Sequence, residues 1–133
     1  MDTEVPLILT GEFRQGRLVI LWKGLEHRIT PHVYSYLLEL VVCRWMSNGG
    51  YLYIDETRTS AGNAVYTRQL VLRLRRICGK AFVENAAKGY RIGITADEID
   101  VDDSVLELRD EIVDARIKAK LMACLLERRS SSP

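Results

Sequence analysis

The chain has 133 residues, of which 47% are hydrophobic and 28% charged, and its formal net charge is +1. This composition excludes a disordered chain and predicts one compact globular domain whose core needs neither a metal nor a disulfide. The strands and helices predicted along the chain give this domain an α+β fold. The three cysteines are odd in number and widely spaced, and no segment reaches the roughly twenty apolar residues that span a bilayer, so we expect a cytoplasmic protein with no membrane partner.

Two runs of aliphatic and β-branched residues open the chain. They cover residues 7–13 and 17–23 and flank the turn-like Arg14-Gln15-Gly16. Strand-forming runs that are separated by a short glycine-containing turn are typical of a β-hairpin. We therefore predict an N-terminal hairpin.

A helix is predicted to follow from Thr30-Pro31 to Met46. Threonine caps helices, and proline at the first helical position loses no hydrogen bond. Ser47-Asn48-Gly49-Gly50 ends the helix, and residues 51–54 form a short strand-like run.

Residues 64–78 repeat their apolar side chains with the period of a helix. The inner face holds Tyr66, Thr67, Leu70, Val71, Leu74, Ile77 and Cys78. The outer face holds Arg68, Gln69, Leu72, Arg73, Arg75 and Arg76. Four arginines without an acidic counterpart are unusual for a solvated helix face, which normally mixes charges, and arginine can pair with phosphates or guanine edges. The segment 55–96 carries eight basic and three acidic residues, which the small net charge conceals.

Two further strands are predicted around residues 82–83 and 90–94, with a loop at 84–89 between them. Leu74-Arg75-Arg76 in the arginine helix and Lys88-Gly89-Tyr90-Arg91-Ile92 in this hairpin resemble the C-terminal effector domain of OmpR/PhoB-type response regulators. The resemblance covers roughly residues 5–95. It implies a winged helix-turn-helix fold, with residues 64–78 as the recognition helix and 88–91 as the wing. The family has a full helix before the recognition helix, so here that helix is either reduced to 55–60 or the fold is trimmed.

The last predicted element is one long helix from Asp97 to about Arg129, acidic at its start and basic at its end, as the helix dipole favours. Apolar residues spaced 4, 3, 4, 3, 4, 3 and 4 apart form a seam typical of a coiled coil. The seam consists of Val101, Val105, Leu108, Ile112, Ala115, Ala119, Met122 and Leu126. It predicts a parallel homodimer, with a tetramer as a further outcome. The alternative is that the helix packs on its own domain through Leu106, Val113, Ile117, Leu121 and Leu125.

Together these features predict a winged-helix DNA-binding domain at residues 1–96 and a helical dimerisation segment at 97–133. The expected function is sequence-specific binding of double-stranded DNA by a dimeric transcription regulator, and the alternative is a winged-helix adaptor that contacts other proteins. The predicted DNA contacts are Arg68, Gln69, Arg73, Arg75, Arg76, Lys88 and Arg91. We expect no enzymatic activity, cofactor or small-molecule substrate. His27 and His32 lack ligands at zinc-like spacing, so no metal is expected either.

Overall fold

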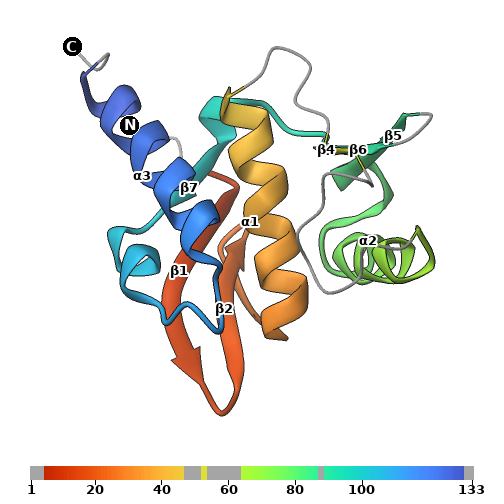
Figure 1. The fold of residues 1–133 in the computed structure, drawn as a ribbon. Helices are drawn as coiled ribbons and strands as arrows, with labels where there is room; N and C mark the ends of the chain where they lie inside the picture. Colours follow the sequence, from red (N-terminus) through yellow and green to blue (C-terminus); the bar gives the residue numbers. More distant parts are fainter. Residues whose placement is uncertain (1–4, 47–51, 54–63, 87–88, 131–133) are drawn as a thin grey trace.

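The structure is a computed structural model that describes residues 5–46, 52–53, 64–86 and 89–130. The strands are β1 (Leu7–Arg14), β2 (Arg17–Trp22), β3 (Leu25–Ile29), β4 (Leu52–Tyr53), β5 (Val83–Ala86), β6 (Gly89–Ile92) and β7 (Ile99–Val101). The helices are α1 (Pro31–Met46), α2 (Ala64–Cys78) and α3 (Ala115–Ser130), with 3₁₀ turns η2 (Lys80–Phe82), η3 (Ala96–Glu98) and η4 (Asp103–Glu107). The predicted α+β class is confirmed (Figure 1).

The first sheet has the strand order β3-β2-β1-β7, in which β7 is parallel to β1 and the other pairs are antiparallel. Its hairpins turn at Gln15-Gly16 and at Lys23-Gly24, and all four residues have positive φ. Such turns match the right-handed twist of the flanking strands. The predicted hairpin is confirmed. The sequence pattern of residues 25–29 did not predict β3, because Ile29 is the only one of its five residues that is buried.

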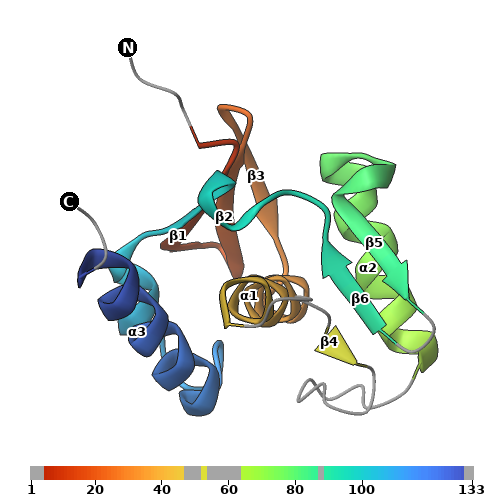
Figure 2. The ribbon, with the colours of Figure 1, turned by 90° about the horizontal axis from the view of Figure 1, so that it is seen from above.

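Helix α1 is the centre of the molecule. Figure 2 shows the first sheet, α3 and the second sheet with α2 arranged around it. Between Val33 and Val42, every side chain of α1 except that of Ser35 is therefore buried. The hydroxyl of the buried Tyr34 donates a hydrogen bond to the Thr10 carbonyl at 2.7 Å.

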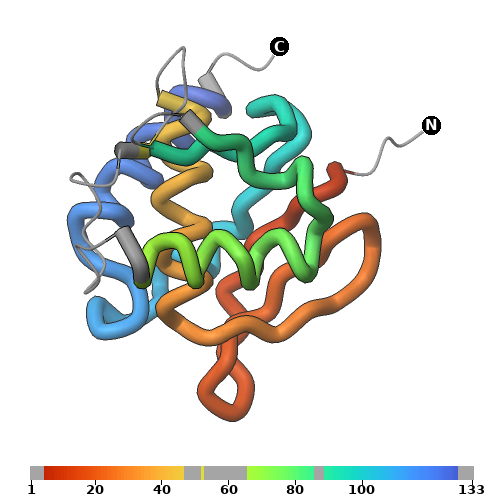
Figure 3. Tube along the Cα trace, turned by 90° about the vertical axis from the view of Figure 1, so that its right-hand side faces the viewer, coloured from red at the N-terminus to blue at the C-terminus, as the bar shows by residue number. Residues whose placement is uncertain are grey.

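The second sheet has the order β4-β6-β5, and β5 and β6 form an antiparallel hairpin beside α2. A strand is thus found at each of the three predicted places, but the bounds differ: β4 lies within 51–54, β5 takes in residues 84–86 of the predicted loop, and β6 ends at Ile92. Figure 3 shows α2 running across this side of the molecule, with its C-terminal end toward the β2–β3 turn. The predicted short helix at 55–60 lies outside the described residues.

The prediction of one long C-terminal helix is wrong. The segment instead forms η3, β7, η4 and a turn before α3 begins at Ala115. Asp102 starts η4, since its carboxylate accepts from the Ser104 amide at 2.9 Å while its own amide donates to Leu9. Because β7 pairs with β1, Val101 and Val105 are buried in this chain rather than on a dimer seam. Apolar residues alternately four and three positions apart therefore fit both a coiled-coil helix and a series of short elements that each bury one residue.

Helix α3 covers the side of α1 opposite α2 (Figure 2). Its buried face consists of Ile117, Leu121, Cys124 and Leu125. The seam residues Ala115, Ala119, Met122 and Leu126 are exposed on its other side, so α3 packs on its own domain, as the alternative prediction had it. None of the helices in the described ranges is long and apolar enough to cross a membrane.

Candidate nucleic-acid interface

Helix α2 separates its side chains into two faces as predicted. Thr67, Leu70, Val71 and Leu74 are buried against the core. The opposite side consists of the exposed residues Arg68, Gln69, Leu72, Arg73 and Arg76, which we call the α2 ridge. The helix contains no acidic residue, so nothing on α2 itself neutralises the ridge.

Arg75 was predicted to belong to this exposed face, but it is half-buried and turned toward β5. Its Nη2 donates to the Val83 carbonyl at 2.8 Å and to the Asn85 side-chain oxygen at 2.5 Å. The helical wheel explains the difference, because Arg75 lies at the border of the outer face next to the hairpin. Arg75 therefore joins α2 to β5.

Of the two predicted wing cations, Arg91 also has a partner within the protein. Arg91 on β6 lies directly across from Glu84 on β5, and its Nη2 is 2.6 Å from that carboxylate. An acceptor within the hairpin therefore already neutralises part of this charge. Lys88 lies outside the described residues.

A second group of arginines adjoins the ridge. Arg17 at the start of β2 and Arg28 near the end of β3 line a pocket of about 250 Å³ together with Arg73 and Arg76 of α2. The pocket wall is completed by Ile29, Thr30, Val33 and Ile77. The sequence analysis missed Arg17 and Arg28. The only signal was their basic character at strand ends, and the pairing that brings the strand ends to α2 is a tertiary feature.

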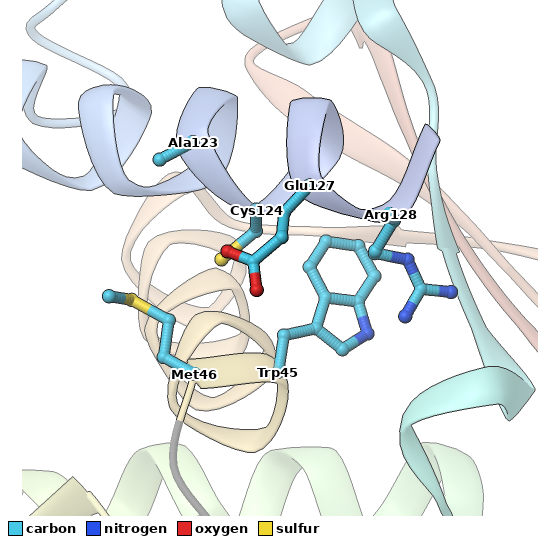
Figure 4. Close-up of a pocket in the computed structure, with 6 residues that line it drawn as sticks. All are labelled: Trp45, Met46, Ala123, Cys124, Glu127 and Arg128. Atoms are coloured by element: carbon cyan, nitrogen blue, oxygen red, sulfur yellow. The ribbon is translucent and has the colours of Figure 1, made fainter. Parts of the chain in front are cut away.

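A separate pocket of about 200 Å³ lies between the C-terminal ends of α1 and α3 (Figure 4). The Arg128 guanidinium sits 4.3 Å from the centre of the Trp45 ring, and the indole N–H donates to the Ala96 carbonyl at 3.0 Å. Burial raises the pKa of the Cys124 thiol, which lines the same pocket. A protonated thiol is a poor nucleophile. The contacts of Trp45 with Arg128 and Ala96 therefore join α3 and η3 to α1.

Two other potentially reactive side chains, Cys78 and His32, lie in structural surroundings. Burial raises the pKa of Cys78 to about 12. His32 Nδ1 lies 2.8 Å from the Tyr66 hydroxyl, which links the start of α1 to α2. In the part of the chain that the structure describes, no group of three or more His, Cys, Asp or Glu residues is placed to hold a metal ion.

Comparisons with known proteins found no match for this chain: no protein-family model matches it, and neither does any curated protein or solved structure.

Proposed function

We propose that this protein binds double-stranded DNA in a sequence-specific manner as a small, non-enzymatic, dimeric transcription regulator. In this proposal the fold is a winged helix-turn-helix, α2 is the recognition helix, and the β5–β6 hairpin is the wing. The element order α1, β4, α2, β5, β6 and the place of the hairpin beside α2 support this interpretation.

The exposure of the α2 ridge is the observation that carries the proposal. A helix about 10–12 Å in diameter matches a major groove about 12 Å wide. Arg68, Arg73 and Arg76 are free to pair with phosphates or guanine edges, since the buried face of α2 already holds the helix on the core. The hairpin would then reach the neighbouring backbone, where contacts add affinity rather than specificity.

Binding is tested by fluorescence anisotropy with labelled random-sequence duplexes over a series of salt concentrations. For the parent, affinity should fall steeply as salt rises, because each neutralised phosphate releases counterions. The triple variant R68A/R73A/R76A should bind more weakly, with a salt slope smaller by up to about three units. Specificity is tested by selecting preferred duplexes from a random pool.

A matched control removes the same charge elsewhere. The variant R109A/R116A/K120A loses three cations from exposed positions in and just before α3, across α1 from α2. It should bind duplexes like the parent. Equal binding by the parent and the ridge variant would reject the proposal.

The adaptor function has one observation in its favour. Leu72 is 47% exposed in the middle of the ridge, and with Arg75, Arg76 and Lys80 it lines an open hollow. An exposed leucine among cations suits a partner surface that is acidic and apolar. An adaptor predicts duplex binding that is weak and equal in the parent and the ridge variant.

A further inference from the structure

The pocket beside the α2 ridge joins cations from parts of the chain that are far apart in sequence. Arg17 and Arg28 come from adjacent strands of the first sheet, and Arg73 and Arg76 come from α2. The floor is apolar, because Ile29 and Val33 are almost fully buried. Four arginines therefore line one common space of about 250 Å³.

The charge in this space is poorly balanced. No acidic residue lines the pocket. Arg28 has one ion pair, with Glu26 at 3.3 Å on the same strand. Among the described residues, Arg17, Arg73 and Arg76 have no ion-pair partner. Like charges held together repel one another, and a bound anion relieves that repulsion.

The start of α1 adds to the positive potential. Thr30 and Val33 line the pocket, and α1 begins at Pro31 between them. The Tyr34 amide makes the first helical hydrogen bond, with the Thr30 carbonyl at 2.9 Å. No acidic residue occupies the first turn, so the partial positive charge of this helix terminus is not neutralised locally.

We propose that this pocket binds a phosphate group. Each arginine guanidinium can donate two parallel N–H hydrogen bonds to two oxygens of a phosphate, and a phosphate carries more acceptor oxygens than a carboxylate does. The adjoining α2 ridge favours the backbone of a duplex as the source of this phosphate. In that case the inference extends the proposed function, by placing the first sheet against the DNA strand that flanks α2. A free phosphate ion offers the same chemistry, and the experiment separates the two sources.

The test uses Arg17 and Arg28, since neither belongs to the α2 ridge. The variants are R17A, R28A and R17A/R28A, and the matched control is R14A. Arg14 lies directly across from Arg17 in the β1–β2 register, but it pairs with Glu12 and, at 3.9 Å, with Glu26, and it does not line the pocket. All of these arginines are exposed, so circular dichroism and the melting temperature should be unchanged in every variant.

Two probes are titrated into the full chain. The first is a labelled random-sequence duplex over a salt series, for which each single pocket variant should lower the salt slope by about one unit, R17A/R28A by about two, and R14A not at all. The second is inorganic phosphate, followed by calorimetry with acetate as the control anion. A phosphate site should bind phosphate in preference to acetate, and R17A/R28A should weaken that binding about tenfold or more.

The outcomes distinguish the two sources and the two proposals. Loss of duplex affinity in the pocket variants relative to R14A assigns the site to backbone phosphate. If R17A/R28A removes phosphate binding and duplex binding is unchanged, the site is assigned to free phosphate. The proposed function is then decided by the ridge variant alone. The inference is overturned if both probes bind the pocket variants as they bind R14A, or if duplex binding is unchanged in those variants and acetate binds as well as phosphate.

Discussion

Arg75 donates from α2 to the carbonyl of Val83 in β5, with Nη2 2.8 Å from the oxygen. This bond crosses the boundary between the helix and the hairpin that together form the candidate interface. Its effect is to set the position of the hairpin relative to the helix, so one arginine of the predicted DNA-contacting row has a structural role.

Replacing Arg75 with alanine should therefore destabilise the protein, whereas replacing the neighbouring Arg76 should not. The R75A variant leaves the carbonyl of the buried Val83 without its charged donor, at a cost of about 1–2 kcal/mol. The R76A variant removes an exposed side chain and should change the free energy of unfolding by less than about 0.5 kcal/mol. Urea unfolding of both variants measures the difference. Equal stabilities would show that the Arg75 contact contributes nothing.

The Glu84–Arg91 pair predicts an increase in duplex affinity on removal of the carboxylate. In E84A the hairpin loses the carboxylate that lies 2.6 Å from Arg91, so this part of the surface becomes more positive and attracts phosphates more strongly. Binding of random duplexes should strengthen by about two- to fivefold, the size of an exposed charge pair. Anisotropy titration measures the change, and E107A, an exposed carboxylate in η4, is the control. Unchanged or weaker binding by E84A would place the hairpin outside the interface.

Gly11 should not tolerate alanine. The strand β1 changes register between Leu9 and Phe13, and at this point a Cβ on Gly11 would collide with the backbone carbonyl of Ser104 in η4. We expect G11A to lower the free energy of unfolding by about 1–3 kcal/mol, the usual cost of overpacking. Thermal or urea unfolding measures it.

The control for this prediction is S104A. It removes the hydroxyl that accepts from the Gly11 amide at 3.0 Å and donates to Asp102 at 2.7 Å, but it creates no clash, so its cost should be smaller, about 0.5–1.5 kcal/mol. The double variant G11A/S104A should be no more stable than G11A, since the clash involves the backbone. A fully stable G11A protein would mean that η4 does not pack on β1 in solution.

Self-association remains a prediction, now confined to α3. The exposed residues Ala115, Ala119, Met122 and Leu126 share one side of this helix. If they join two copies, a carboxylate at the 49% exposed Met122 should dissociate the dimer. Sedimentation velocity should show a dimer for the parent and a monomer for M122E. The control K120E adds a carboxylate away from this side and should stay dimeric, whereas a monomeric parent would contradict the prediction.

Local features of this chain could be predicted from its sequence. The Gln15-Gly16 turn, the Thr30-Pro31 helix start and the two faces of α2 each depend on residues close together in the chain. Turn chemistry, capping and helical periodicity operate over that short range. For the same reason the exposure of Arg68, Gln69, Arg73 and Arg76 followed from the spacing of their buried neighbours.

Only the tertiary structure decided where distant segments meet. The parallel pairing of β7 with β1 converted the first half of the apparent coiled-coil seam into core, with Val101 and Val105 buried. The docking of β5 against α2 removed Arg75 from the exposed row. The approach of β2 and β3 to α2 created the arginine pocket. These outcomes depend on which surfaces exclude water together, and a spacing of apolar residues does not record the partner against which each one is buried.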